Sequence, residues 1–263
     1  MKEQNARLEI VTQCRAIARL GLSQGAVGSL SLRLLDDLLI TPADVPLEKV
    51  EPKMIAVMPL AGEYGAWHGT MKPTSEWRMH LDIARARSDI SAIVHTDALY
   101  ATILACLRKP IPAIHYMIAL FGGPDVRCTN YAPFGTKQLA DLVLAGLKDR
   151  QGVLLANHGM VATGATLGQA MWRAAELETL ARIYHHALSV GKPATLTDAA
   201  VHEIVERFKV SDHHAANQAQ SEAPTARAAK VAAKKPPKKK KVVTRRRSSA
   251  PEPKSDKRVA KKR

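Results

Sequence analysis

The chain has 263 residues, of which 46% are hydrophobic and 24% charged, enough for a folded domain with a sizeable core. Its three cysteines form no CxxC pair, which argues against a disulfide framework and fits a reducing cytoplasm. No apolar stretch approaches the roughly 18 residues of a membrane helix, and the N-terminal MKEQNARLEI lacks the apolar core of a signal peptide. Secreted and membrane-spanning proteins are therefore disfavoured.

The net charge of +15 is concentrated at the C-terminal end of the chain. Residues 215–263 hold 17 Lys and Arg against three acidic residues, which leaves 22 basic and 21 acidic residues in 1–214. Because residues 215–263 contain no aromatic residue and no Leu, Ile or Met, we expect this segment to be disordered and the folded domain to end at 214. Such a polycation binds nucleic acid or another polyanion through counterion release, or it is a solvated extension without a partner.

The first half of the chain alternates between helical and extended patterns. Periodic apolar residues predict a helix over 4–20, with Ile10, Cys14, Ile17 and the neighbouring Leu8 on its buried side. The next expected elements are a strand at 37–41, a strand within 50–59, a helix at 76–87 that Thr74 or Ser75 can cap, a strand at 91–95, a helix at 98–107 and a segment at 114–121 that fits either state.

The second half continues in the same way. Thr136 can cap a helix with Leu139, Val143 and Leu147 on one stripe. A buried strand at 153–156, a long helix at 166–190 and a last helix at 197–208 follow. Strands and helices mixed along one sequence indicate a layered α/β domain.

Metal-capable side chains follow two of the predicted buried strands. His95 and Asp97 are two residues apart, so in extended backbone they point to the same side. His158 comes directly after the strand at 153–156, and Glu76 at a helix start could add a carboxylate. If the two strands are neighbours, these groups meet at one edge of the sheet. The spacing alone leaves open whether the histidines bind a metal or are structural.

Two further features have an ordinary explanation beside a functional one. His80 lies one turn after Glu76, a spacing that usually reflects a contact along one helix. The loop at 25–29 could bring backbone N–H groups to an anion, although a short glycine loop is more often only a turn.

Seven segments resemble, in order, the class II aldolase/adducin family over about residues 7–208. They are RLGLSQGAVGSLSLR (19–33), LLITPADVP (38–46), PTSEWRMH (73–80), AIVHTD (92–97), IPAIHYMIALFGG (111–123), APFGTKQLA (132–140) and NHGM (157–160). The resemblance implies a single three-layer α/β/α domain with a mixed sheet. It also implies a homotetramer with active sites at the subunit interfaces.

The resemblance implies a metal-dependent lyase that cleaves a sugar phosphate or a related hydroxy-ketone through an enediolate. In the family, an H-x-H pair and one distant histidine hold zinc, and these positions are His95, Asp97 and His158 here. Glu76 matches the acid/base, which also ligates the resting metal. Tyr116 matches a tyrosine that acts on the substrate oxygen from the adjacent subunit.

The resemblance also implies an anion site for the substrate phosphate. Gly28, Ser29, Thr74 and Ser75 match the positions that hold this phosphate, and Phe134 falls in a matching segment that we assign to the substrate site. A helix beginning after Thr74 and Ser75 suits an anion, since its free N–H groups and its dipole both favour negative charge.

Three departures from the family pattern involve four positions. Zinc, the family's metal, stays the first expectation, but Asp97 replaces a histidine ligand and makes Mn²⁺ or Mg²⁺ alternatives. Ser29 replaces an asparagine. Ala43 and Asp44 replace a Thr-Gly pair, which puts a carboxylate near the expected phosphate and predicts a substrate less anionic than a sugar phosphate.

Two alternatives remain beside the aldolase. Epimerisation or dehydration would begin with the same polarised oxygen. An adducin-like protein without catalysis would keep the fold, lose the metal and use its basic segment for interactions. Metal content separates this last alternative from the enzymes.

Overall fold

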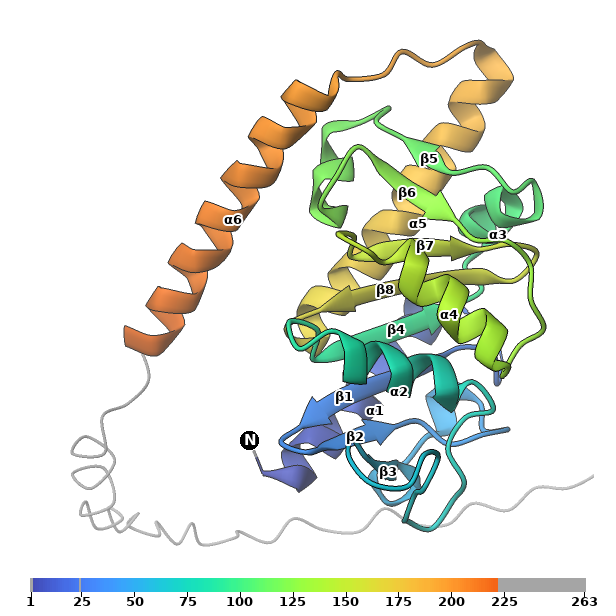
Figure 1. The fold of residues 1–263 in the computed structure, drawn as a ribbon, viewed down its shortest axis with the longest axis vertical. Coiled ribbons are helices and arrows are strands. Elements are labelled where there is room, and N and C mark those ends of the chain that lie inside the picture. The colour runs from blue at the N-terminus through green and yellow to red at the C-terminus, as the bar shows by residue number, and fades with distance from the viewer. Residues whose placement is uncertain (1, 24, 222–263) are drawn as a thin grey trace, which may run out of the picture. The chain divides into compact units, whose positions relative to one another are not determined.

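Within residues 2–23 and 25–221, which the computed structural model describes, eight strands form one sheet in the order β3-β2-β1-β4-β8-β7-β6-β5 (Figure 1). Neighbouring strands are antiparallel except β6 and β7, which are parallel, so the sheet is mixed as expected. The strands are β1 Ser29–Leu34, β2 Asp37–Ile40, β3 Ala56–Pro59, β4 Ala92–Thr96, β5 Ile111–Pro112, β6 Asp125–Cys128, β7 Gly152–Leu155 and β8 Gly159–Gly164.

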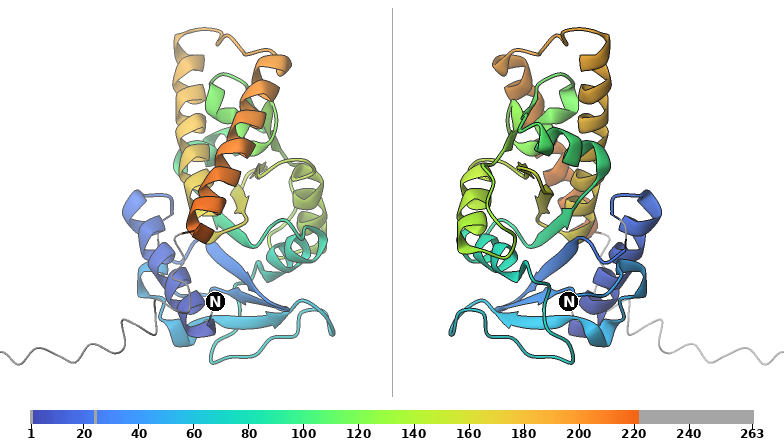
Figure 2. Two further views of the ribbon diagram at one scale, coloured as in Figure 1. Left: turned by 90° about the vertical axis from the view of Figure 1, so that its left-hand side faces the viewer. Right: turned by 90° about the vertical axis from the view of Figure 1, so that its right-hand side faces the viewer.

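Helices cover both faces of this sheet. Helices α2 and α4 pack on one face, and α1, α3 and α5 lie on the other (Figure 2). The three-layer α/β/α arrangement is therefore confirmed. The helices are α1 Glu3–Leu20, α2 Trp77–Ala86, α3 Leu99–Cys106, α4 Lys137–Gly146, α5 Leu167–Val190 and α6 Asp198–Ser221, with short 3₁₀ helices η1 Leu47–Lys49, η2 Pro52–Met54 and η3 Tyr116–Phe121.

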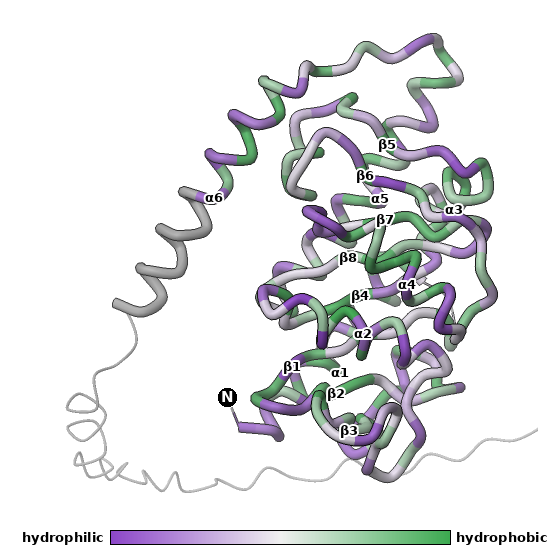
Figure 3. Tube along the Cα trace, viewed as in Figure 1, coloured by the Kyte–Doolittle hydropathy of each residue, from purple (hydrophilic) through white to green (hydrophobic). Residues whose placement is uncertain are grey.

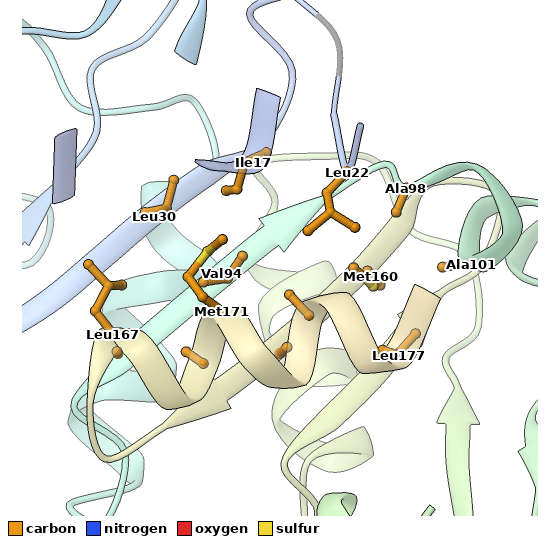
Figure 4. Packing of buried hydrophobic residues seen from close by; sticks show 14 of the residues in the cluster. Ile17, Leu22, Leu30, Val94, Ala98, Ala101, Met160, Leu167, Met171 and Leu177 are labelled. Atoms are coloured by element: carbon orange, nitrogen blue, oxygen red, sulfur yellow. The ribbon is translucent and has the colours of Figure 1, made fainter. Parts of the chain in front are cut away.

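Two hydrophobic cores follow from the alternation of side chains along the strands. In β4, Ile93 packs into the core under α2 and α4, whereas Val94 packs into the core under α1, α3 and α5. Figure 4 shows Val94 next to Met171 of α5, with Met160 of β8 farther along the helix, toward Leu177. Both faces of β4 and β8 are buried. The residues at the end of β4 and just before β8 are therefore attached to firmly packed strands.

The first helix is close to its prediction. Ile10, Cys14 and Ile17 are fully buried, and Gly21 ends the helix with a φ of 68° and a backbone N–H bonded to Ala18. Leu8, which we expected on the buried side, is 48% exposed. It lies beside the buried stripe rather than within it.

Several elements differ from the sequence analysis. The segment at 50–59 begins with a 3₁₀ turn, so only its end forms β3, and 114–121 contains the 3₁₀ helix η3. Neither Thr74 nor Ser75 caps α2, because Glu76 occupies the N-cap position and no side chain caps it. The strands that had no counterpart in the prediction are β1, β5, β6 and β8.

Helix α6 continues to Ser221, past the predicted domain boundary at 214. Residues 215–221 read AANQAQS, and Ala and Gln are good helix formers. Figure 3 shows the hydropathy of each residue. Polar and apolar residues alternate along the first half of α6, whereas β7 is hydrophobic. The rest of the basic segment lies outside the described residues. Among the described helices, none combines the length and the apolar character needed to cross a membrane.

Candidate active site

Two histidines meet where β4 ends and β8 begins. These strands are antiparallel neighbours, with Thr96 opposite Met160, so the end of one strand lies beside the start of the other. His95 is the fourth residue of β4, and His158 is in the short turn that joins β7 to β8. Their ring centroids are 4.9 Å apart in an edge-on arrangement. The sheet topology thus brings together two side chains that the sequence separates by about sixty residues.

Glu76 reaches the same place from the N-terminus of α2. Its Oε2 lies 2.7 Å from His95 Nε2, and its Oε1 lies 3.4 Å from His158 Nε2. The three residues offer ligand atoms that all lie within 4.8 Å of one another. Glu76 is 8% exposed and His95 1%. The cluster of Glu76, His95 and His158 is called the triad below.

A second hydrogen bond orients His95. Its Nδ1 donates to the carbonyl of Met160 at 2.9 Å, which leaves Nε2 directed at Glu76. Histidines that bind metals in proteins are usually held in this way, because the bond at one nitrogen fixes the tautomer and the direction of the other.

The charges in the triad depend on one another. Burial alone would raise the pKa of Glu76, but the charge and the hydrogen bond of His95 outweigh burial and lower this pKa to about 2. Burial alone would lower the pKa of His95, but the Glu76 carboxylate raises it to about 9. Burial and the charge of His95 lower the pKa of His158. At neutral pH the triad without a metal is therefore a buried ion pair beside a neutral imidazole.

Asp97 lies next to the triad without joining it. Its Oδ1 is 3.7 Å from His95 Nε2, and Asp97 is outside the group of mutually close ligand atoms found among the described residues. The absence of a side chain at Gly159 leaves room for the Asp97 carboxylate, which a Cβ there would strike. The prediction that Asp97 ligates a metal stays a prediction.

The residues fit a divalent cation. Glu76 Oε1 and Asp97 Oδ1 are buried and have no hydrogen-bond partner, a state that costs free energy unless a cation or a proton donor satisfies them. Two imidazole nitrogens and a carboxylate are a common ligand set for Zn²⁺. Imidazole donors suit Zn²⁺ better than Mn²⁺ or Mg²⁺, which prefer oxygen ligands.

The triad opens into a cavity of about 270 Å³. One wall is the loop Ala26–Gly28 and the other is the segment at 74–76, with residues near Phe134 at the mouth. Gly28 has a φ of 90°, and a Cβ on it would lie 2.9 Å from the carbonyl oxygen of His95, so a larger residue does not fit there. Of the predicted substrate residues, Gly28, Thr74, Ser75 and Phe134 line this cavity.

The other predicted residues lie elsewhere. Ser29 is fully buried and bonded to His80, so its side chain does not reach the cavity. Tyr116 is 52% exposed on η3 and does not line the cavity of its own chain. Asp44 is exposed and forms an ion pair with Lys72 at 3.2 Å, on the outer side of Thr74 and Ser75.

Five residues of the cavity wall were not singled out individually from the sequence, although two of them lie in the loop at 25–29: Ala26, Val27, Tyr131, Ala132 and Asn157. Asn157 is adjacent to the predicted His158, and its φ of 55° marks the tight turn that places this histidine. Val27 and Tyr131 carry no pattern that distinguishes them from ordinary loop residues.

Comparison with known proteins places this geometry in a family. The family model described as "Class II Aldolase and Adducin N-terminal domain" matches residues 8–185. The chain is 44% identical over 200 residues to the 5-methylthioribulose-1-phosphate/5-deoxyribulose-1-phosphate aldolase of Rhodospirillum rubrum, covering 76% of this chain and 89% of that protein. It is 38% identical to the L-fuculose phosphate aldolase of Escherichia coli K12, covering 80% of this chain and 96% of that protein.

Solved structures agree with the sequence matches. The structure of an L-fuculose 1-phosphate aldolase aligns with a TM-score of 0.75 at 38% identity, covering 78% of this chain and 96% of the other. YgbL of Klebsiella pneumoniae, titled a putative aldolase/epimerase/decarboxylase, aligns with a TM-score of 0.70 at 30% identity, covering 78% and 99%.

Proposed function

The chain belongs to the class II aldolase and adducin family, and from this premise we propose that it is a divalent-metal-dependent aldolase that cleaves a ketose 1-phosphate between C3 and C4. The observation that carries the proposal is the triad, whose Glu76 Oε1 is buried on the cavity wall without a hydrogen-bond partner. The products would be dihydroxyacetone phosphate and an aldehyde.

Glu76, His95 and His158 would hold the metal, with Asp97 as a further ligand. A bound divalent ion supplies Lewis acidity for the substrate carbonyl and hydroxyl oxygens. Breaking the C3–C4 bond requires that the C4 hydroxyl lose its proton and that C3 gain one. Glu76 is ionised at neutral pH and lies on the cavity wall, so we assign it to take up the proton that leaves the C4 hydroxyl and to deliver that proton to C3. Tyr116 of an adjacent subunit is assigned to the transfer of the proton at the C4 oxygen.

The phosphate would lie between the loop Ala26–Gly28 and the start of α2. Backbone N–H groups and the hydroxyls of Thr74 and Ser75 suit an anion there. The sequence predicted that Asp44 would repel a phosphate, but its ion pair with Lys72 offsets that charge. Together with the sugar phosphates named for the relatives, this pair supports a phosphorylated substrate.

The far end of the substrate would be apolar. Val27, Tyr131 and Phe134 line the cavity and are 44%, 53% and 67% exposed, so apolar surface remains free to contact a ligand. A C5 methyl or methylthio group would bury part of that surface, whereas a C5 hydroxyl would lose hydrogen bonds to water. This supports a 5-deoxy- or 5-methylthio-ketulose 1-phosphate, the substrate type named for the 44% identical relative.

Kinetics on matched substrates test the proposal. 5-Deoxyribulose 1-phosphate and ribulose 1-phosphate differ only in the C5 hydroxyl, and we expect the first to have a kcat/KM at least about tenfold higher. Free 5-deoxyribulose should react far more slowly than its phosphate. Identifying dihydroxyacetone phosphate separates an aldolase from an epimerase or a dehydratase. A protein that retains no divalent ion and cleaves none of these compounds would be adducin-like instead.

The assembly and the basic segment are part of the proposal. The half-exposed Tyr116, which does not line its own cavity, supports a homotetramer in which it completes the site of a neighbour. Light scattering at micromolar concentration should give four times the chain mass.

The 17 basic residues of 215–263 support salt-sensitive, sequence-independent binding of nucleic acid or another polyanion. A chain ending at Ser221 should lose this binding and keep its aldolase activity. If the shortened chain still binds DNA, the positive charge of this segment is not the cause.

A further inference from the structure

A second buried histidine lies directly behind the cavity. His80 is on α2, one turn after Glu76, and it is completely buried. Hydrogen bonds of 2.8 Å link its Nε2 to Ser29 Oγ and its Nδ1 to Ser31 Oγ. Both serines are also completely buried. Each nitrogen of His80 therefore has a partner on β1, a strand about fifty residues away in the sequence.

The bond to Ser29 joins the two walls of the cavity. Ser29 directly follows Gly28, which lines the cavity, and it lies opposite His95 in the pairing of β1 with β4. His80 belongs to the helix whose N-terminus carries Glu76 and Ser75. One hydrogen bond thus connects the end of the loop Ala26–Gly28 to α2, the helix that supplies the carboxylate of the triad.

The bond to Ser31 lies deeper in the domain. Ser31 is opposite Ile93 on one side and Ile40 on the other, both of which are buried in the core under α2. Neither Ser31 nor its neighbours line the cavity. The two bonds are therefore alike in length and burial but differ in what they connect.

His80 makes these bonds as a neutral imidazole. Burial, and then the charge of His95, lower the pKa of His80 to about 3. A neutral imidazole has one donor and one acceptor nitrogen, so one serine donates a hydrogen bond and the other accepts one. The link adds no charge next to the triad.

We propose that His80 is a positioning residue that acts through Ser29, holding the loop Ala26–Gly28 and the start of α2 at the spacing that aims Glu76 at the metal and the substrate. This inference rests on the proposed aldolase function. Ser29, which the sequence assigned to the substrate, then acts from behind the cavity wall. A shift of about 1 Å in such a group can lower a rate by as much as a hundredfold.

The two serines form a matched pair of test variants. Ser29→Ala and Ser31→Ala each remove one buried hydroxyl from His80, so both should lower the urea midpoint of unfolding by a similar amount. We expect Ser29→Ala to lower kcat about tenfold and to weaken zinc binding by the apoprotein severalfold. Ser31→Ala should keep kcat and the zinc dissociation constant within twofold of wild type.

Two substitutions of His80 test the same two hydrogen bonds by changing the histidine instead of the serines. A glutamine amide reaches the place of Nε2 and an asparagine amide that of Nδ1, so His80→Gln keeps the bond to Ser29 and His80→Asn keeps the bond to Ser31. We expect His80→Gln to retain most of kcat and His80→Asn to match Ser29→Ala. The double variant Ser29→Ala/His80→Asn should be no slower than either single variant.

The outcomes separate the inference from the proposed function. If both serine variants change kcat and zinc affinity equally per folded molecule, or if His80→Gln and His80→Asn behave alike, His80 is only structural and the inference fails. If Ser29→Ala is slow but His80→Asn is not, Ser29 contacts the substrate directly and the inference also fails. A wild-type protein that neither binds zinc nor cleaves a ketose 1-phosphate would overturn the proposed function and this inference together.

Discussion

His95 and His80 lie close together and are equally buried, yet their surroundings give them opposite chemistry. His95 has a carboxylate as its partner at Nε2, which raises its pKa to about 9. His80 has only hydroxyls as partners, and burial lowers its pKa to about 3. The chemical nature of the partner, more than the degree of burial, therefore decides which histidine carries charge.

The two clusters also differ in whether their polar atoms are satisfied. Both nitrogens of His80 and both serine hydroxyls have partners. Around His95, the oxygens Glu76 Oε1 and Asp97 Oδ1 are buried without one. A cluster with unsatisfied buried oxygens can gain much from a cation, whereas a satisfied cluster gains nothing. The comparison thus separates the group proposed to hold a metal from the group proposed to support it.

The largest effect is expected from His158→Ala. Removing this ligand should release the divalent ion and lower kcat/KM by about a thousandfold, because the metal supplies several kcal/mol of stabilisation to the transition state. Metal content by mass spectrometry and turnover of a ketose 1-phosphate measure both effects. His202→Ala, at an exposed position on α6, is the control and should change neither. Full metal content in His158→Ala would remove this residue from the ligand set.

His80→Leu should have the next largest effect, on stability. It leaves two buried serine hydroxyls without partners, at about 1–3 kcal/mol each, so the free energy of unfolding should fall by roughly 2–6 kcal/mol. Urea denaturation measures this change. His80→Gln keeps one of the two bonds and should lose about half as much. Equal losses in the two variants would show that packing, not hydrogen bonding, holds α2 to β1.

This serine–histidine link also explains what the sequence analysis could not predict. The predicted strands at 91–95 and 153–156 were found because both their faces bury apolar residues. Strand β1 reads SLSLRL and buries both serines as well as Leu30 and Leu32, since the serines face His80. The partner of those serines is distant in sequence, so β1 was missed and His80 was interpreted as an ordinary contact along the helix.

The candidate site was predicted more completely than the strand behind it. Glu76, His95 and His158 match a specific family pattern, and the sheet topology brings them together. The placement of Ser29 and Asp44 depends on contacts with His80 and Lys72 that no local spacing encodes. The family pattern therefore located the triad, whereas the surroundings of Ser29 and Asp44 emerged only from the fold.

The raised pKa of His95 predicts that metal binding depends on pH. In the apoprotein His95 is protonated below about pH 9, and a metal at Nε2 needs the neutral ring, so binding at pH 7 should release about one proton. The affinity for the metal should rise by up to about tenfold per pH unit between pH 6.5, the usual pKa of a histidine, and about pH 9. Calorimetry in buffers of different ionisation enthalpy measures the released proton. No release at pH 7 would contradict the ion pair with Glu76.

The apoprotein should also show the opposite pH dependence of the two histidines. His95, with a raised pKa, contributes stability below pH 6.5 that is lost as the pH rises through about 9. His80, with a lowered pKa, opposes this, because the unfolded chain binds its proton first and stability is lost as the pH falls from about 6.5 to 3. Urea unfolding of His80→Gln should show a shallower acid-side slope, with the contributions of Glu76 and His158 remaining, and keep the alkaline one. An unchanged acid slope would mean that His80 is charged in the folded protein.

The smallest effect is expected at the mouth of the cavity. Phe134→Ala should reduce the preference for 5-deoxyribulose 1-phosphate over ribulose 1-phosphate by a few-fold, since it removes part of the apolar surface near C5. The ratio of the two kcat/KM values measures the preference. Leu35→Ala, in the exposed turn that follows β1, is the control. A ratio that stays constant would place the far end of the substrate elsewhere.

The most direct measurement is the anomalous X-ray signal of zinc in crystals of the metal-loaded protein. The account predicts one peak per chain within bonding distance of His95 Nε2, His158 Nε2 and a carboxylate oxygen of Glu76, with His80 still bonded to both serines. A peak at another place, or none while Glu76 remains paired directly with His95, would contradict it.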